Sequence, residues 1–275
     1  MKKLYTVFIN FNSGQQLQIG VSSVLKLPSV SGVVVVDNGS SDNSLKGLGK
    51  IKDKRVTVIK NIKNLGFYKA VNMGVKEALS RGADLIMPLD FDLDFSHDFI
   101  SSLQKVNADI AAPVLKFQRD GKWVYDCGGR INWTFGRSYH LEKSQPLAPK
   151  DFAKYAGDKS SHNWYDFVSG GCTIFRKEVF DKIGFFDEDF FVYYGDTDFA
   201  LKAKSAGFRV VMDPNTIVHH KLEVTKVTKN IKKLKIALSD NLTFIRKRLK
   251  WYFKPLAYLY ICLLSLKIGF NLLLK

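Results

Sequence analysis

Residues 83–95 read ADLIMPLDFDLDF, and this stretch decides the fold. Its first part, 84–89, is a short apolar run with the length and composition of a buried strand. Three carboxylates follow at alternate positions, Asp90, Asp92 and Asp94. Because alternate side chains of an extended chain lie on one face, Asp90 and Asp92 can point the same way.

A pair of carboxylates at the end of a buried strand needs a partner, because two negative charges at close range repel each other. Oxygen ligands suit a hard divalent ion such as Mg²⁺ or Mn²⁺, which also takes phosphate oxygens as ligands. One interpretation is therefore a metal site that holds a diphosphate. The other is a solvated acidic turn in which Asp94 or Ser96 caps the next helix. These residues alone leave both interpretations open.

Strand and helix patterns alternate through the first half of the chain. In the run GVVVVD at 32–37 the four central residues are β-branched valines, which is typical of a parallel strand buried on both faces. Further strands are predicted at 4–9, 55–60, 84–89 and 109–115, with helices at 15–27 and 68–81. This alternation predicts an α/β fold with a doubly wound sheet, in which ligands collect outside the carboxyl ends of the strands.

Polar residues follow each of the first three predicted strands, at the edge where such ligands bind: Asn10, Asn12, Asp37, Asn38, Asn61, Asn64 and Gly66. An aspartate that ends a strand, such as Asp37, can accept hydrogen bonds from a ribose or a base, or it can cap a helix. Neither GxGxxG nor GxxxxGK[ST] occurs in the sequence, so no glycine-rich phosphate loop is predicted. A metal ion would have to hold the phosphates.

The second half is predicted to be more irregular. Segment 122–140 reads as a hairpin-rich insert, whose Trp123, Trp133 and Tyr139 could stack on a ring of a ligand or simply cover the sheet. The polar stretch 151–162 is predicted to be a loop. Helices are predicted at 176–183 and 196–206, and a strand at 208–212 that is followed by two histidines.

Charge is unevenly distributed along the chain. The net charge is +16, and residues 221–275 hold 13 of the 42 Lys and Arg but only 2 of the 26 Asp and Glu. This excess predicts an anionic partner at the C-terminal end. Three scattered cysteines do not form a disulfide framework or a zinc site, so a reducing compartment is expected. The start, MKKLYTVFIN, fits a first buried strand better than a signal peptide.

The C-terminal segment combines a basic and an apolar pattern. Apolar residues recur at three- and four-residue steps over 231–252, which predicts an amphipathic helix with a basic opposite face. After Pro255 the longest apolar run is about a dozen residues, shorter than the roughly 20 that span a bilayer. We expect an interfacial anchor on an anionic leaflet. The alternatives are a helix pair on the catalytic domain or a homodimer interface. A nucleic-acid partner is not expected, because the aromatics lie on the apolar face.

Four motifs together resemble the nucleotide-binding half of family 2 glycosyltransferases of the GT-A fold: TVFINFNSG, VVVVDNGSSDNS, NLGFYKAVNMG and LIMPLDFD. They run in the family's order. The resemblance implies a mixed, Rossmann-like sheet flanked by helices. It also implies that Asp37 contacts the nucleoside base, and that Asp90 and Asp92 hold the ribose and a divalent metal, Mg²⁺ or Mn²⁺, on the donor diphosphate. The full set of implied nucleotide-sugar contacts is Asn10, Asn12, Asp37, Asn38, Asn64, Gly66, Asn72, Asp90, Gly170 and Gly171.

Residues 169–220 resemble the acceptor-side block of the same family. There the resemblance implies that Asp196 is the general base that deprotonates the acceptor hydroxyl. An aspartate in the first turn of a helix could equally be a cap. The chain departs from the family at Gly195, where the usual residue is Glu. The resemblance also implies a late histidine on the metal, and His220 fits the spacing better than His219, which would face the opposite way if both lay on one strand.

The resemblance implies an inverting, metal-dependent glycosyltransferase that moves a sugar from a dTDP- or UDP-sugar to a hydroxyl of a lipid-linked glycan. The expected process is cell-surface polysaccharide synthesis, with the enzyme peripheral on the cytoplasmic face of the plasma membrane. The alternatives are a polyprenyl-phosphate sugar transferase and an inactive sugar-nucleotide-binding scaffold. The expected division is a catalytic domain at 1–220, with donor and acceptor halves at 1–116 and 117–220, and a tail at 221–275.

Overall fold

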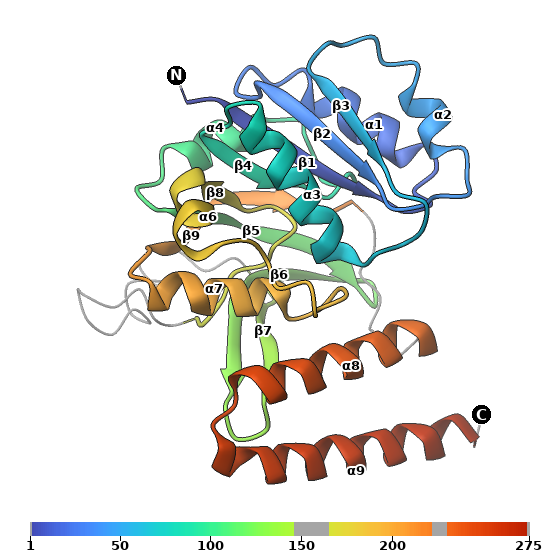
Figure 1. Cartoon of the computed structure of the whole chain (residues 1–275), viewed down its shortest axis with the longest axis vertical. Helices are drawn as coiled ribbons and strands as arrows, with labels where there is room; N and C mark the ends of the chain where they lie inside the picture. The colour runs from blue at the N-terminus through green and yellow to red at the C-terminus, as the bar shows by residue number, and fades with distance from the viewer. Residues whose placement is uncertain (1, 146–164, 222–229, 274–275) are drawn as a thin grey trace.

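The computed structural model describes residues 2–145, 165–221 and 230–273, and its centre is one mixed sheet (Figure 1). Four parallel strands form one half of the sheet in the order β3-β2-β1-β4. Their bounds are β1 Leu4–Asn10, β2 Gly32–Asp37, β3 Val56–Lys60 and β4 Leu85–Pro88. The helices that alternate with them are α1 Gln16–Val24, α2 Ser44–Leu48 and α3 Phe67–Ser80. This half agrees with the predicted alternation to within a few residues at each end.

The other half of the sheet is mostly antiparallel. Strand β8 lies between β4 and β5 and is antiparallel to both, and the hairpin β6–β7 extends the sheet beyond β5. Strand β9 pairs in parallel with β5. The bounds are β5 Ile110–Arg119, β6 Lys122–Asn132, β7 Arg137–Lys143, β8 Ile174–Arg176 and β9 Val210–His219. The expected mixed, Rossmann-like sheet is confirmed, as is the hairpin at 122–140.

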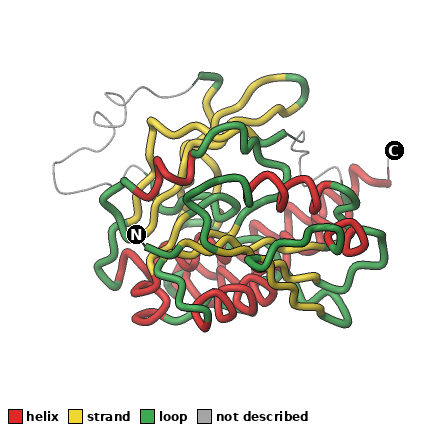
Figure 2. The backbone as a smooth tube through the Cα atoms, turned by 90° about the horizontal axis from the view of Figure 1, so that it is seen from above, coloured by secondary structure: helices red, strands yellow, loops and turns green. Residues whose placement is uncertain are grey.

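Helices follow or flank these strands in the second half and form the C-terminal region. They are α4 Phe99–Gln104, α6 Lys177–Ile183, α7 Gly195–Ser205, α8 Ile231–Arg248, the short 3₁₀ helix η2 Trp251–Phe253 and α9 Lys254–Leu273. Figure 2 shows most of the helices gathered along one side of the strands. The predicted loop at 151–162 lies outside the described residues.

The four valines of strand β2 show why both faces of this strand are apolar. Val34 and Val36 pack into a core that includes helix α3, whereas Val33 and Val35 pack into a second core that includes α1 and α4. Successive side chains of a strand point to opposite faces, so a strand covered on both faces must be apolar at every position. The sheet therefore lies between two cores, and polar side chains are confined to the strand ends.

One predicted strand is wrong in its extent, and one of the alternatives left open for the acidic turn is not supported. The strand predicted at 208–212 runs on to His219, because a bulge accommodates Pro214: Asp213 accepts hydrogen bonds from Asn215 N and Thr216 Oγ1, and pairing with β5 resumes at Ile217. Helix α4 is capped by Asp98, whose carboxylate accepts from Ser101 N at 3.0 Å, and not by Asp94 or Ser96.

The first tail helix packs on the catalytic domain. Phe244 and Ile245 of α8 are fully buried in the core, and the Asn241 amide donates to Gly136 O in the β6–β7 turn at 2.6 Å. The predicted apolar stripe is only partly the buried face, because Leu242 is 41% exposed whereas Asp240 is buried. Helices α8 and α9 lie beside the hairpin (Figure 1). Within the described residues, no helix has the length and apolar character needed to cross a bilayer.

Candidate active site

Backbone pairing brings the end of β9 to the turn that follows β4. Leu93 and His220 form an antiparallel bridge, and Lys221 N donates to Asp92 O at 2.8 Å. Asp94 N donates to His219 O, also at 2.8 Å. These bonds join segments that are more than a hundred residues apart in the sequence, and they hold the first residue after β9 directly against the acidic turn.

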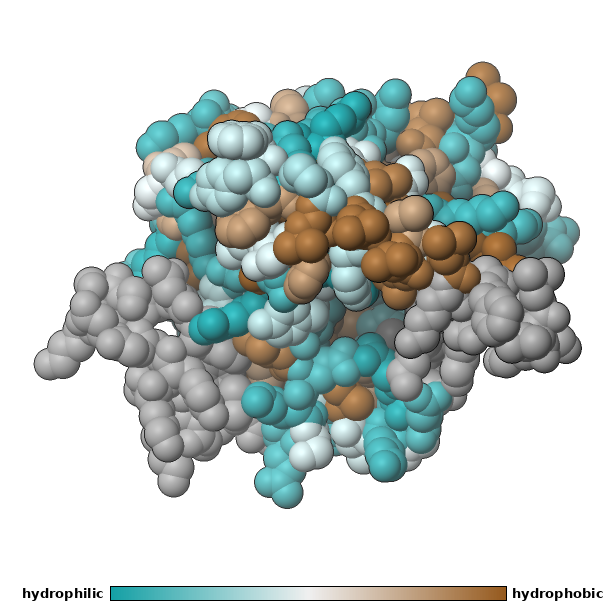
Figure 3. Space-filling view, turned by 90° about the horizontal axis from the view of Figure 1, so that it is seen from below, coloured by the Kyte–Doolittle hydropathy of each residue, from teal (hydrophilic) through white to brown (hydrophobic). Residues whose placement is uncertain are grey.

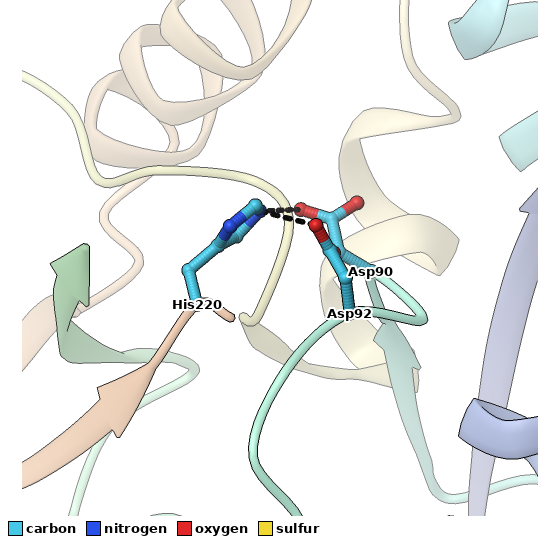
Figure 4. A group of neighbouring side chains, drawn as sticks. All are labelled: Asp90, Asp92 and His220. Carbon is cyan, nitrogen blue, oxygen red and sulfur yellow. Dashed lines mark ion pairs between the residues drawn. The ribbon is translucent and has the colours of Figure 1, made fainter. Parts of the chain in front are cut away.

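Asp90, Asp92 and His220 form a compact cluster at this junction, with their side chains pointing toward one another (Figure 4). His220 Nε2 lies 3.3 Å from Asp92 Oδ2 and 4.0 Å from Asp90 Oδ2. All three possible ligand atoms lie within 4.8 Å of one another. Asp90 and Asp92 therefore point the same way, as predicted, but they do so in the turn after β4 and not on an extended strand, and His220 joins them. The His219 ring instead contacts Trp123, with the ring centroids 5.1 Å apart.

The charges of this cluster suit a divalent cation. Burial and the neighbouring Asp92 charge raise the pKa of Asp90 to about 6, while His220 opposes the shift. A cation between the carboxylates would remove this repulsion, and two oxygens with one imidazole nitrogen are an acceptable donor set for Mn²⁺. Asp94 has other partners, Ser96 and Lys221. The residues that would hold a metal are Asp90, Asp92 and His220.

A glycine loop joins this cluster to Asp196. Gly171 lies against Asp90: its carbonyl accepts from Asp90 N at 3.0 Å, and a Cβ at this position would collide with the Asp90 carboxylate. Gly170 N donates to Asp196 Oδ2 at 3.3 Å. The backbone at 170–171 thus approaches one carboxylate on each side. The metal cluster and the candidate base flank two adjacent glycines.

The local surroundings of Asp196 favour a base and not a simple cap. Burial raises its pKa, against opposing effects of the His140 charge and of hydrogen bonds from Thr197 N and Gly170 N. The N-cap position of α7 is Tyr194, with φ of 67°, and not Asp196. A carboxylate with a raised pKa is a stronger base, which suits proton abstraction from a hydroxyl.

The structure explains why Gly195 stands where Glu is usual. The ring of Tyr68 lies directly on Gly195, and a Cβ at that position would overlap it. The Tyr68 hydroxyl accepts a hydrogen bond from Asp196 N at 3.1 Å. Tyr68 therefore fills the space of the missing side chain and contacts the backbone of the candidate base.

Sequence reasoning missed one pair beside the base, Asp126 and His140. His140 Nδ1 lies 2.8 Å from Asp126 Oδ2, and the Ser169 hydroxyl donates to the same oxygen. Ser169 is adjacent to Gly170, which contacts Asp196. Charges on Asp126, Asp196 and Glu142 raise the pKa of His140 to about 9 against the opposing effect of burial. The pair lies on two strands whose register the sequence does not reveal.

This pair predicts a pH dependence of stability. The pKa of His140 is about 9 in the folded state and about 6.5 in an unfolded chain, so protonation favours folding. Its contribution is complete below about pH 6.5 and is lost as the pH rises through about 9. In urea unfolding, the wild type should therefore exceed His140→Gln in free energy of unfolding by more at pH 6 than at pH 9.5. The prediction would be contradicted if this difference in free energy of unfolding did not change with pH. It would also be contradicted if the exposed His97→Gln variant showed the same pH dependence.

The predicted nucleoside-side residues form one hydrogen-bonded network across the ends of β1, β2 and β3. The Asn10 amide donates to Asp37 Oδ1 at 2.7 Å, and Asn12 Oδ1 accepts from Ser41 N at 2.8 Å. The Asn38 amide donates to Asn64 Oδ1 and to Gly66 O, both at 3.0 Å. The three loops are thus fixed relative to one another. Asp37 and Asn38 are almost fully buried, so the network holds the loops in place from beneath the surface at this edge of the sheet.

Asn72 is placed differently from the other predicted contacts. Its side-chain NH₂ donates to Phe186 O and Glu188, and its oxygen accepts from Phe186 N. The side chain is 1% exposed. These bonds use both ends of the amide and tie helix α3 to the segment after α6.

Residues 6–184 match the family Glycosyl transferase family 2, and residues 107–274 match the Glycosyl transferase family group 2. The first match covers more than half of the chain. The chain belongs to glycosyl transferase family 2. The recognition from sequence is confirmed, and the protein is a glycosyltransferase.

Relatives within family 2 include rhamnosyltransferases. The dTDP-rhamnosyl transferase RfbF of Shigella flexneri is 29% identical over 222 residues, which cover 79% of this chain and 68% of the relative. The N-acetylglucosaminyl-diphospho-decaprenol L-rhamnosyltransferase of Mycobacterium tuberculosis is 23% identical over 81% of this chain and 77% of the relative.

A solved structure supports the fold assignment. The mannosyltransferase PcManGT from Pyrobaculum calidifontis, in complex with GDP-Man and Mn²⁺, superposes with a TM-score of 0.59. The match has 15% sequence identity and covers 93% of this chain and 68% of that one. At this identity the likeness bears on the fold, and it confirms the predicted GT-A architecture.

Proposed function

We propose that this family 2 enzyme transfers a sugar from a nucleoside diphosphate donor to an acceptor hydroxyl, with inversion and with help from a divalent cation. The observation that carries the proposal is the glycine loop 169–171, which holds Asp90 of the metal cluster on one side and Asp196 on the other. A metal-bound leaving group and a base are the two things that such a displacement needs.

Each residue of the site then has a role. Asp90, Asp92 and His220 would hold the cation, whose charge neutralises the departing nucleoside diphosphate. The network of Asn10, Asp37 and their neighbours would fix the nucleoside. Asp196 accepts the proton of the attacking hydroxyl as that oxygen bonds to the anomeric carbon. Because the base lies across the glycine loop from the metal cluster, attack from the face opposite the leaving group is favoured, which inverts the configuration.

The donor and acceptor are proposed from the relatives. A dTDP-sugar is favoured because RfbF is named as a dTDP-rhamnosyl transferase, and UDP- or GDP-sugars are the alternatives. A lipid-linked glycan acceptor fits the name of the M. tuberculosis relative, and places the reaction in polysaccharide or glycan synthesis. A polyprenol monophosphomannose synthase is 24% identical. A phosphate nucleophile needs no base, however, so the raised pKa of Asp196 favours a hydroxyl acceptor.

The proposal is tested by supplying the full-length enzyme with dTDP-, UDP- and GDP-sugars and lipid-linked acceptors. Release of nucleoside diphosphate is measured in Mn²⁺ and in EDTA. We expect one donor class to be consumed, with Mn²⁺ and with acceptor present. Tight donor binding without turnover on any acceptor would favour the alternative of an inactive scaffold. Full activity in EDTA would exclude the metal role.

We also propose that the tail holds the enzyme on the cytoplasmic face of the plasma membrane. Helix α9 exposes a row of leucines at three- and four-residue steps, Leu256, Leu259, Leu263 and Leu266, each at least 45% exposed. Figure 3 shows apolar residues gathered as a band on this lower side of the molecule. Basic residues Lys232, Lys233 and Lys235 on α8 are exposed. An apolar row with nearby cations suits an anionic membrane surface.

This proposal predicts flotation of the enzyme with anionic vesicles. High salt should weaken the binding without abolishing it, because only the charge contribution of about 1 kcal/mol per cation is screened. Leu259→Glu/Leu263→Glu should lose the binding. Ile62→Glu, at a fully exposed isoleucine in the loop after β3, should keep it. If the wild type is instead a dimer that does not bind vesicles, and the leucine variant is a monomer, the leucine row is an interface between two copies of the chain.

A further inference from the structure

Helix α8 contacts the loop that leads to the candidate base through one buried carboxylate. Asp240 accepts three backbone hydrogen bonds, from Phe191 N at 2.9 Å, Val192 N at 2.9 Å and Tyr193 N at 2.8 Å. Its side chain is 2% exposed. Aspartate is not favoured inside a helix, and a buried carboxylate is costly unless it is hydrogen-bonded. The three bonds therefore account for its presence in the middle of α8.

The loop held in this way ends at the candidate base. Tyr194 follows it in the left-handed conformation, which is uncommon for a residue other than glycine, and Gly195 then begins α7. Asp196 is the second residue of that helix, three residues after Tyr193. With so short a connection, the position of residues 191–193 sets the position of the Asp196 carboxylate.

The C-terminal end of α8 also contacts the first turn of α7 and the segment before it. Arg248 donates to the buried Asp198 carboxylate, two residues after Asp196, and Lys247 pairs with Asp187 and Asp189. The ring of Phe244 packs on Tyr194, with the centroids 5.1 Å apart. Contacts from Asp240 to Arg248 thus enclose the segment that carries the base.

We propose that α8 belongs to the catalytic machinery and that Asp240 is a positioning residue, which fixes the loop 191–193 and through it the base. The inference rests on the proposed role of Asp196. It makes α8, and not only the sheet and its loops, a part of the site. It also means that the C-terminal region cannot be removed at residue 230 without displacing the base.

Asp240→Asn tests the proposal, because an amide of the same shape cannot accept all three N–H groups. We expect kcat to fall about 10- to 100-fold, the loss typical of a small misplacement of a reacting group. The donor dissociation constant, measured by calorimetry with nucleoside diphosphate and Mn²⁺, should change less than twofold. The control is Ser239→Ala on the same helix, at the exposed residue next to Asp240. It should keep kcat.

A double variant separates positioning from general damage. If Asp240 acts through Asp196, then Asp196→Asn/Asp240→Asn has the same residual kcat as Asp196→Asn alone. An additional loss in the double variant, or a fall in donor affinity equal to the fall in kcat, would overturn the proposal. If Asp196→Asn keeps its activity, the proposed function fails. If only Asp240→Asn keeps a normal kcat, the proposed function stands and the positioning role of Asp240 fails.

The wild-type protein offers a measurement that needs no folded variant. Backbone amides bonded to a buried carboxylate exchange slowly with solvent. The amides of Phe191, Val192 and Tyr193 should therefore be protected from hydrogen exchange in the full-length enzyme. Exchange of all three at the rate of an open loop would overturn the proposal, even if Asp240→Asn does not fold.

Discussion

Asp196→Asn should lower kcat by about 10²- to 10⁴-fold, the usual contribution of a general base. The donor dissociation constant should change only a few-fold, because a base acts on the acceptor proton in the transition state and does not hold the donor. Asparagine preserves the shape of the side chain, and its one oxygen can keep the bond from Thr197 N, whereas the longer bond from Gly170 N to the other oxygen is lost. The measurement is steady-state kinetics together with calorimetric titration of the donor nucleotide in Mn²⁺.

The matched control is Asp181→Asn, at an exposed carboxylate of helix α6 that pairs with Lys177. It should leave both kcat and donor affinity unchanged. A normal kcat for Asp196→Asn would show that another group takes the proton. Asp198 and Asp187 are poor candidates, because Arg248 and Lys247 already pair with them. Asp126, which is bonded to His140 beside the base, would be the next to test.

The donor side of the site could be predicted from sequence because local rules place it. Polar residues at the carboxyl ends of parallel strands meet at one edge of the sheet. Strand alternation also predicts that Asp90 and Asp92 converge, although in the structure β4 ends at Pro88 and the two carboxylates meet in the turn that follows. The four consecutive valines within 32–37 predict a central strand, since a strand covered on both faces is apolar on both. In each case a pattern of fewer than a dozen residues is sufficient to predict where the side chains lie.

The acceptor side depends on contacts between distant segments, and no local pattern encodes them. Asp126 meets His140 only because β6 and β7 pair in one register, and Asp240 meets residues 191–193 only because α8 packs on the end of α7. Apolar periodicity over 231–252 does not separate the exposed Leu242 from the buried side of α8 and gives no sign of the buried Asp240, because periodicity reflects hydrophobicity and not tertiary hydrogen bonds. The sequence signal that could have indicated this contact is Asp240 itself, a charged residue among the apolar positions of a helix.

The second large effect is expected at the metal cluster. Asp92→Asn should lower transfer by about 100-fold or more, because a cation that stabilises the leaving diphosphate contributes several kcal/mol and each 1.4 kcal/mol is a factor of ten. Asp92 is the appropriate residue to change, since its carboxylate is buried and lies nearest to His220, at 3.3 Å. Asp90 shares the cluster but also packs against Gly171, so its replacement would disturb the loop as well.

The decisive comparison is nucleotide binding with and without metal. In Mn²⁺ the wild type should bind the nucleoside diphosphate at least about tenfold more tightly than Asp92→Asn, because one ligand to the cation is lost. In EDTA the two proteins should bind it equally, since the network around Asn10 and Asp37 is intact in both. Asp94→Asn is the matched control from the same acidic run, and its carboxylate pairs with Lys221 outside the cluster. It should bind nucleotide as the wild type does in Mn²⁺ and in EDTA. Equal binding by the wild type with and without Mn²⁺ would remove the metal from the donor site and leave Asp92 and His220 as an ion pair.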